Sequence, residues 1–559
     1  MNGYRKRLLA LGLLALSALA GCKDYLQEEN LSGRTAETYY GTAQGFEDLV
    51  KSNYSPLRPV VNYPGLYFLG TDIFTTGDPS ATSGLNNYDN NLNSSIADVD
   101  SYWKQLYYSI QLTNTTLVWA TKVTGLDATT VATRVAEAKA LRAYYYYLLA
   151  ENFGDVPLVL TPVTEPTFGY TRDPEQKVYD QIISDLNDAI GALPVATTAN
   201  FGRVTKGMAQ HLLAKVYLTR GYKSYGAGQT DFNAAGQLAE TVINSGNYTL
   251  LSDFSKLFDP TVSNFQVNSE VIFSVQYSTN VASNSYAYAT APTTLVSGNG
   301  LHNLFTMDLS VYPAISRSAL YNKANILVAP TPYFFTLFDK TRDARYQATV
   351  YTAIYAQVAA GGFAVGDTVI YFPDVAFSPA RKATKKYTVF NPNEYDTQTS
   401  YALRSFPSFK KFREVNLAYG DNLGTRDTYV FRLAETYLIA AEAYLQAGNS
   451  AKAVAYYNTV RVRAGKAGTN PTTGKLYKDE LKVTAVSLDD ILDERARELA
   501  GESFRWLELK RTGKLVARTN LYNKETAKAG RLQTNDLLRP IPQSQIDLNR
   551  GTFTQNPGY

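Results

Sequence analysis

The stretch AKVYLTRG at residues 214–221 is matched by AEAYLQAG at residues 441–448, so both follow the pattern Ala-x-x-Tyr-Leu-x-x-Gly. Each stretch precedes a second helical segment in which Ala, Thr and Val recur at the same spacing. Small Ala residues let paired helices approach closely, Tyr fills the space between neighbours, and Gly ends the first helix. We therefore predict tetratricopeptide-like helical hairpins. Chance similarity between ordinary helical hairpins is the alternative.

Helical periodicity extends over most of the chain on either side of this pair of repeats. It covers residues 36–55, 97–122, 130–152, 174–192, 205–221, 231–245, 427–447, 450–464 and 488–511. Between the two blocks, short strand-like runs such as 271–275 and 368–372 are separated by Gly, Pro, Asn and Ser. We predict a mostly α fold in which helical-repeat regions at 36–250 and 427–559 frame a loop-rich, partly β insertion at 251–426.

The composition is that of a folded globular protein, and it excludes several classes of function. The chain has 559 residues, of which 45% are apolar and 19% charged. Its 54 Lys and Arg nearly balance 50 Asp and Glu, which argues against nucleic acid as a partner. One Cys and two His exclude disulfide scaffolds, Cys-rich zinc sites and Cys–His nucleophiles, so we expect no cofactor. The 43 Tyr and 25 Phe suit either an ordinary core or a surface that contacts hydroxyl-rich or peptide-like ligands.

The first 21 residues have the features of an export signal. A basic Arg5-Lys6-Arg7 is followed by an apolar run at 8–20 that is too short to span a bilayer. The signal ends in Leu-Ala-Gly before Cys22, which resembles the bacterial lipobox. We therefore expect a lipoprotein signal peptide at 1–21, lipidation at Cys22 and a flexible tether over 22–35, anchored in the membrane through the lipid. A generic secretory signal with an incidental Cys is the alternative.

Five further segments occur in an order that resembles one known family. They are EAKALRAYYY at 137–146 running into FGDVPLV at 153–159, RDP at 172–174, YVFRLAETYLIAAEA at 429–443, ILDERARELAGESFRWLELKRTG at 491–513, and PIP at 540–542 with TQNPGY at 554–559. Together with the lipobox they resemble SusD/RagB-type outer-membrane lipoproteins from the leader to the last residue. The resemblance implies a SusD-like α-α superhelix fold. It also implies a non-catalytic lid, exposed at the cell surface, on a SusC-like TonB-dependent transporter in the outer membrane.

The function that the resemblance implies is capture of an oligosaccharide and its delivery to the transporter. A peptide-binding lid of a peptide transporter resembles this chain equally well, and the sequence does not choose the ligand. A lipid-anchored glycan hydrolase that uses Glu494 and Glu498 is a further alternative, as is an adaptor that binds no small ligand. Interleaved Arg495, Arg497 and Arg505 favour ion pairs over catalytic carboxylates.

Two loops contain the aromatic and polar mixture that sugar binding requires. Aromatic faces lie against the C–H faces of sugar rings while Asn, Asp or Arg bonds the hydroxyls. The candidate ligand-binding residues are Tyr67, Asp72, Tyr88, Asn90 and Asn91 in the loop at 63–93, and Tyr286, Tyr288 and His302 in the loop at 277–303. His302 is expected to be exposed. Packing of these loops against the helical frame is the alternative.

One pattern resembles a calcium loop incompletely. Asp89, Asn91 and Asn93 fall at positions 1, 3 and 5 of an EF-hand-like loop, but Ser94 replaces the turn Gly and Asp100 is shorter than the expected Glu. We therefore predict an Asn-rich loop and no metal. His211 lies beside two leucines in a predicted helix and is interpreted as a structural histidine. Trp506 is expected to be buried.

Overall fold

The computed structural model describes residues 35–559, apart from 82, 263–264, 289–290, 297, 396–402, 416 and 503, and leaves out the side chains of 285–297. Cys22, the leader and the tether up to residue 34 lie outside the described residues. The predictions of lipidation and of the boundaries at 21 and 35 therefore stay predictions.

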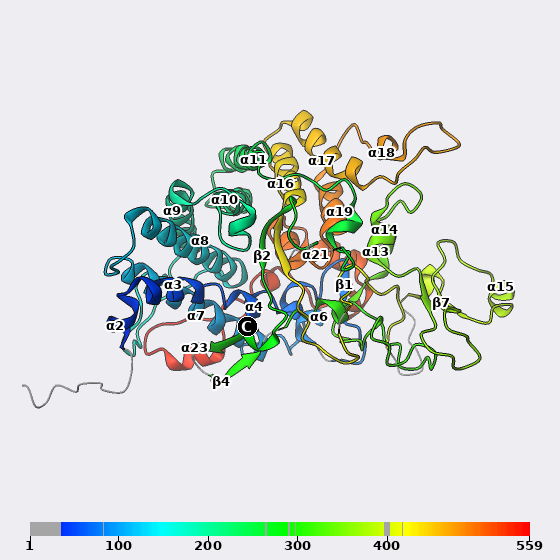
Figure 1. Cartoon of the computed structure of the whole chain (residues 1–559), viewed down its shortest axis with the longest axis horizontal. Helices are drawn as coiled ribbons and strands as arrows, with labels where there is room; N and C mark the ends of the chain where they lie inside the picture. The colour runs from blue at the N-terminus through cyan, green and yellow to red at the C-terminus, as the bar shows by residue number, and fades with distance from the viewer. Residues whose placement is uncertain are drawn as a thin grey trace, which may run out of the picture.

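The N-terminal half forms an arc of antiparallel helices (Figure 1). Its long helices are α3 (Ala43–Ser52), α7 (Ala97–Trp119), α8 (Ala128–Phe153), α9 (Glu175–Ala192), α10 (Lys206–Arg220) and α11 (Gln229–Ile243), preceded by the short α2 (Ala36–Tyr40). Polar caps begin several of them, as where the side chains of Thr42, Asp127 and Thr205 accept backbone N–H groups of the first turn. Each long helix from α7 to α11 packs against the next along the chain.

The C-terminal helices continue the same arc. They are α16 (Leu433–Gln446), α17 (Ser450–Ala464), α19 (Leu488–Leu499) and α20 (Arg505–Arg511). Helix α16 packs against α11, so the two copies of the sequence repeat become neighbours in space. A Cβ atom added at Gly236 of α11 would meet the ring of Tyr444 at 2.9 Å. A small residue thus lets the helices approach while Tyr fills the gap, and the predicted mostly α, hairpin-based fold is confirmed.

Within the described residues, short strands, most of them from the middle of the chain, form four small sheets. The strands are β1 (Phe74–Thr75), β2 (Val271–Val275), β3 (Ser285–Tyr288), β4 (Ala291–Val296), β5 (Ala329–Pro330), β6 (Ala353–Tyr355), β7 (Thr368–Tyr371), β8 (Thr388–Val389) and β9 (Thr428–Arg432). Strand β1 pairs antiparallel with β5, β2 with β9 and β3 with β4. Strand β7 lies between antiparallel β6 and parallel β8. The strand predicted at 271–275 is confirmed.

Two helices predicted in the C-terminal region differ from their predicted bounds. The helix expected at 427–447 begins at Leu433, because residues 428–432 form β9 and pair with β2. The helix expected at 488–511 breaks between Leu499 and Arg505, around Gly501 with φ +76°. A Cβ atom there would meet the ring of Phe412 at 2.6 Å, so only glycine fits. At both places the chain between C-terminal helices contacts the middle segment, through the pairing of β9 with β2 and the packing of Gly501 against Phe412.

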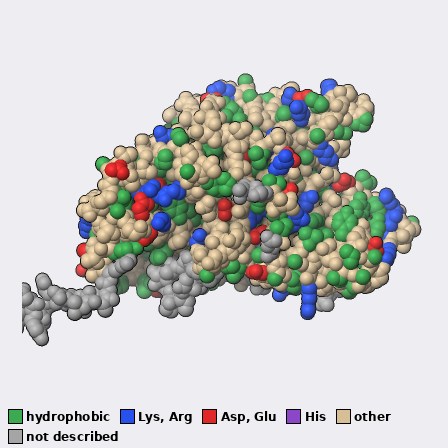
Figure 2. Space-filling model, viewed as in Figure 1, with side chains coloured by type: hydrophobic (Ala, Val, Ile, Leu, Met, Phe, Trp, Pro, Cys, Tyr) green, Lys and Arg blue, Asp and Glu red, His purple; other side chains and the backbone are tan. Residues whose placement is uncertain are grey.

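Short helices complete the chain between these elements. They are α4 (Leu57–Val60), α5 (Pro64–Tyr67), α6 (Gly84–Asn87), α12 (Leu301–Leu304), α13 (Pro332–Thr336), α14 (Arg345–Thr349), α15 (Pro379–Ala383), α18 (Tyr477–Glu480), α21 (Leu515–Tyr522), α22 (Lys524–Ala529) and α23 (Gln543–Leu548). One large apolar cluster runs from α7 and α8 through the strands to α20. Basic and acidic side chains are interspersed on the face seen in Figure 2. None of the helices within the described ranges has the length and apolar character needed to cross a bilayer.

Candidate functional site

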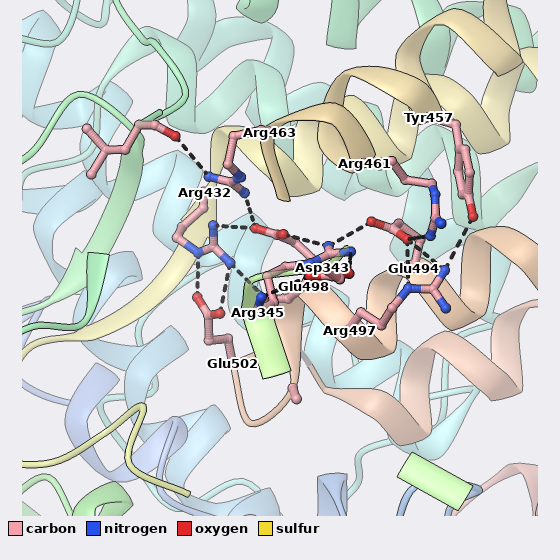
Figure 3. Close-up of polar contacts among 12 residues, drawn as sticks. Asp343, Arg345, Arg432, Tyr457, Arg461, Arg463, Glu494, Arg497, Glu498 and Glu502 are labelled. Atoms are coloured by element: carbon pink, nitrogen blue, oxygen red, sulfur yellow. Dashed lines mark hydrogen bonds and ion pairs between the residues drawn. The ribbon is translucent and has the colours of Figure 1, made fainter. Parts of the chain in front are cut away.

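The two carboxylates considered for catalysis lie at the centre of a buried ion-pair network (Figure 3). One guanidinium nitrogen of Arg345 lies 2.7 Å from Glu494 Oε1 and 3.0 Å from Glu498 Oε2. Glu494 also pairs with Arg461 and Arg497, and all three of these groups come from α17 and α19. The prediction that these carboxylates form ion pairs is confirmed, but of the three arginines named from the sequence only Arg497 pairs with one of them. Arg495 pairs with Glu435 and Glu508, and Arg505 pairs with Asp72.

The electrostatics of this network do not suit hydrolysis. Burial alone would raise the pKa of Glu498, but Arg463, Arg432 and Arg345 hold that pKa at about 2. Three arginines likewise hold the pKa of Glu494 far below its usual range against the effect of burial. A glycosidase needs one carboxylic acid with a raised pKa and an open path to the substrate. Both side chains are fully buried, so neither carboxylate is open to a substrate.

Tyr67 and Asp72, two of the predicted ligand contacts, are buried in the frame. The Tyr67 ring stacks on Phe504 with ring centroids 3.7 Å apart. Asp72 accepts hydrogen bonds from Arg505 and Arg518, and these two cations lower its pKa although burial opposes them. The expectation that these two side chains face a ligand is therefore wrong for this structure, because the helices that follow residue 487 cover them.

Tyr88 is also buried, which corrects the expectation of an exposed stacking platform. Tyr88 caps the C-terminal end of α6, where its backbone is left-handed with φ +53°. The residue is only 5% exposed. The hydroxyl donates to the carbonyl oxygen of Gly70 at 2.8 Å and accepts from Trp506 Nε1 at 3.1 Å. Trp506 is fully buried, as predicted. The Asn-rich turn therefore turns its tyrosine inward to join the N-terminal loop to α20.

Both histidines have structural surroundings. His302 lies in α12 and is 8% exposed, so the expectation that it is exposed is wrong. Its Nδ1 lies 3.2 Å from the carbonyl oxygen of Asn299 and its Nε2 lies 2.9 Å from that of Asp421. His211 is fully buried with Nδ1 2.9 Å from Thr436 Oγ1, and burial lowers its pKa. His211 is a structural histidine, as interpreted from the sequence.

Asn90 and Asn91 are exposed in the turn after α6. Asp89 accepts from the backbone N–H of Asn91 at 2.9 Å, which makes an Asx turn. Asp100 pairs with Lys104 at 2.6 Å, so the last position of the calcium-like pattern is taken by a cation. Among the residues that the structure describes, no group of three or more His, Cys, Asp or Glu could hold a metal ion.

Tyr286 and Tyr288 fall on β3, which pairs with β4 as an antiparallel hairpin. Their side chains lie outside the described part of the structure. Their role as ligand contacts stays a prediction.

A segment that the sequence did not single out connects the two predicted loops. The backbone N–H of Asn325 donates to Asn303 in the second loop at 3.0 Å, and Gly77 in the first loop donates to the carbonyl oxygen of Leu327 at 3.4 Å. We call residues 77–81 and 323–327 the loop face. Its exposed residues are Ser80, Ala81, Lys323, Asn325, Ile326 and Leu327.

Backbone strain concentrates beside this loop face. Four described non-glycine residues have positive φ angles; three of them are Arg317 (+58°), Asn322 (+34°) and Ile326 (+58°), and the fourth is Tyr88. A β-branched residue such as Ile326 rarely adopts this conformation, and such strain clusters at binding sites. Asn322 tolerates the conformation and offered a weak sequence signal, whereas Ile326 offered none.

Comparisons with known proteins agree with this architecture. Residues 269–559 match the family described as "SusD family", and residues 69–218 match the one described as "Starch-binding associating with outer membrane". A SusD-like protein, P2, of Formosa agariphila is 26% identical over 98% of both chains. The starch-binding protein SusD of Bacteroides thetaiotaomicron is 27% identical, covering 78% of this chain and 74% of its own.

A solved structure shows the same fold. The laminarin-binding SusD-like protein superposes with a TM-score of 0.67 and 26% identity, covering 93% of this chain and 100% of that protein. The arrangement of helices and middle segment described above is thus shared along nearly the whole length of both chains.

Proposed function

The chain belongs to the SusD family, and we propose that it captures an oligosaccharide at the cell surface and delivers it to a partner TonB-dependent transporter. The observation that carries this proposal is the similarity to a laminarin-binding protein, which extends over 93% of the chain at 26% identity. The relationship to a starch-binding protein of the same family supports the same class of ligand.

The proposed mechanism is binding without catalysis. Glu494 and Glu498 are the pair of carboxylates that a hydrolase would have used, and arginines surround both of them in the interior. Their depressed pKa values leave neither as a proton donor near neutral pH. We therefore expect the glycan to be released with its chemical structure unchanged.

We propose the loop face together with the β3–β4 hairpin as the region that holds the glycan. Tyr286 and Tyr288 would provide the stacking surfaces, and Asn90 and Asn91 are exposed amides able to bond sugar hydroxyls. Pre-formed strained backbone at Ile326 supports this placement, because a rigid rim loses less conformational entropy on binding.

Lipidation at Cys22 and placement in the outer membrane, facing the cell exterior, belong to the same proposal. The family is associated with the outer membrane, as the description of the matched N-terminal region states. A protein held by acyl chains next to a membrane transporter needs no spanning helix of its own.

Incubation of the protein, produced from residue 23 onward, with a panel of glycans and peptides tests the proposal. Laminarin and starch are the first probes because relatives bind them. Retention on a glycan affinity gel with the glycan unchanged supports capture. Released sugars would support a hydrolase, retention by peptides alone would support a peptide lid, and no retention by either class would favour an adaptor.

A further inference from the structure

A groove of about 520 Å³ opens between α7, the extended segment at residues 157–170 and the stretch from α23 to Phe553. Its walls are largely aromatic, with Trp103, Tyr107, Tyr108, Tyr170 and Phe553 among the lining residues. The groove is distinct from the loop face, and no residue predicted from the sequence as a ligand contact lines it.

The groove is bordered by exposed apolar side chains. Two of the lining residues, Val163 (41%) and Leu548 (64%), keep more than a third of their surface exposed. Leu160 (38%) and Phe168 (43%) lie on the same 157–170 segment and are exposed as well. Exposed apolar side chains at an apolar groove are a feature of interaction sites.

Three of the side-chain amides that line the groove are already engaged. The Gln111 side chain donates to the carbonyl oxygen of Val163 at 3.1 Å and accepts from its N–H at 2.9 Å. Asn114 donates to Val159 at 2.9 Å, and Asn549 donates to Tyr170. A sugar would need such amides for its hydroxyls. With these amides holding the 157–170 segment in place, the groove suits an apolar protein side chain better than a glycan.

The position of the groove identifies the side from which a partner approaches. Tyr108 in the groove wall is a neighbour of Tyr40 in α2; burial, and then Tyr40, raise the pKa of Tyr108. Figure 1 shows α2, α7 and α23 together at one end of the molecule, while β7 and α15 lie at the opposite end. From Cys22 to Thr35 the chain covers 13 residues, which reach at most about 45 Å. Lipidation at Cys22 would therefore hold this end of the protein near the membrane.

We propose that this groove docks an apolar, aromatic-bearing extracellular loop of the partner transporter. The inference rests on the proposed function, which supplies a partner embedded in the same membrane. An aromatic or leucine side chain from the transporter would insert between Tyr108 and Phe553, and the rim at Val163 and Leu548 would exclude water around it.

Site-specific photo-crosslinking in intact outer membranes tests the placement. A photoreactive amino acid replaces Leu548. A matched one replaces Val375, which is 79% exposed and lies near β7, at the opposite end of the molecule (Figure 1). A crosslink from position 548 to an extracellular loop of a TonB-dependent transporter, without one from 375, supports the proposal. A crosslink to the transporter from 375 alone, or a 548 adduct with lipid, another protein or nothing, overturns it.

A double variant separates this proposal from the proposed function. Val163→Asp with Leu548→Asp places charges on exposed positions, so the melting temperature should stay unchanged. We expect at least a tenfold loss of co-purified transporter and a glycan affinity of the isolated protein within twofold of the unsubstituted chain. The control, Val358→Asp with Val375→Asp near β6 and β7, should change neither the amount of co-purified transporter nor the glycan affinity. Undiminished transporter recovery, or a loss of glycan affinity in the groove variant, would overturn the docking role, whereas absence of glycan binding by the unsubstituted chain contradicts only the proposed function.

Discussion

Arg505 forms a bidentate ion pair with Asp72 across 433 residues of sequence, with Nε 2.8 Å from Oδ1 and Nη2 2.6 Å from Oδ2. Arg518 bonds the same carboxylate from α21 at 2.8 Å. Two cations and one anion are thus buried together, and they join the loop before β1 to the C-terminal helices. The loop at 63–93 is therefore part of the scaffold over much of its length.

Asp72→Asn should destabilise the protein strongly. Loss of the carboxylate leaves Arg505 and Arg518 buried with less opposing charge, which costs about 3–5 kcal/mol. Denaturant unfolding followed by far-ultraviolet circular dichroism measures this change. Asp188→Asn is the matched control, since Asp188 pairs with Lys139 at the surface and its loss should cost at most about 1 kcal/mol. Equal, small effects of the two changes would contradict the scaffold role of Asp72.

Stability should fall on acidification well before the surface carboxylates are all protonated. The pKa of Glu498 is lowered from 4.5 to about 2, and so is that of Glu151, where Lys223 and Lys510 outweigh burial. A depressed pKa in the folded state contributes stability above the unfolded pKa and loses it as pH falls toward the folded value. We expect a loss of about 2 kcal/mol for each of the two carboxylates between pH 7 and pH 3, measured as the free energy of unfolding in urea.

Glu151→Gln provides the control for this pH dependence. The variant starts less stable at pH 7 because Lys510 and Lys223 lose the Glu151 carboxylate, although Lys223 keeps Glu175. Its stability should fall less steeply toward pH 3. Parallel curves for the variant and the unsubstituted chain would show that Glu151 does not contribute to the acid sensitivity.

Tyr88→Phe should reduce stability and leave glycan binding per folded molecule unchanged. Without the hydroxyl, the carbonyl oxygen of Gly70 and the indole N–H of Trp506 each lose a buried partner, at a cost of about 1–3 kcal/mol. Tyr355→Phe, at a half-exposed site on β6, should stay within about 0.5 kcal/mol. A weaker glycan affinity at unchanged melting temperature would instead return Tyr88 to the ligand site.

The fold followed from local patterns, whereas burial of single loop residues depended on distant parts of the chain. The Ala-x-x-Tyr-Leu-x-x-Gly repeat reports packing between neighbouring helices, and α11 against α16 shows that packing. Nothing near Tyr88 in the sequence indicates that Trp506 lies over it, because the two residues are 418 positions apart. Amphipathic loop residues such as Tyr serve a core and a binding surface equally well.

The helix bounds that the sequence mispredicted have a similar explanation, which is pairing with a distant part of the chain. Residues 428–432 read as the start of a helix because apolar residues continue into α16, yet β2 offers a hydrogen-bonding partner about 150 residues earlier in the chain. Tertiary pairing outweighs local propensity there. The ion pair between Glu494 and Arg497, in contrast, was predictable because both residues lie on α19, three positions apart. The partners of Glu498 come from other elements and gave no local signal; they are Arg345, Arg432 and Arg463.

Cys22→Ala should release the protein from the membrane. The variant lacks the thiol that receives the lipid, and the described helices provide no span to hold it. Fractionation of cells after detergent-free washing measures the distribution. Lys23→Ser is the matched control, because it keeps the thiol of Cys22 and should stay membrane-bound. A variant without Cys22 that remained fully in the membrane fraction would exclude lipid anchoring as its sole attachment.

Tyr286→Ala and Tyr288→Ala should weaken glycan binding with little change in melting temperature. With Tyr67 and Tyr88 buried, these two tyrosines on β3 are the remaining aromatic candidates from the predicted loops. Loss of one aromatic stack costs about 1–3 kcal/mol by analogy with base stacking, which is roughly a five-fold to more than a hundred-fold loss of affinity. Isothermal titration with the best glycan of the panel measures it, and Tyr355→Ala on β6 is the matched control. Unchanged affinity in both hairpin variants would remove β3 from the proposed site and leave the loop face, with Asn90 and Asn91, to be tested by substitution in turn.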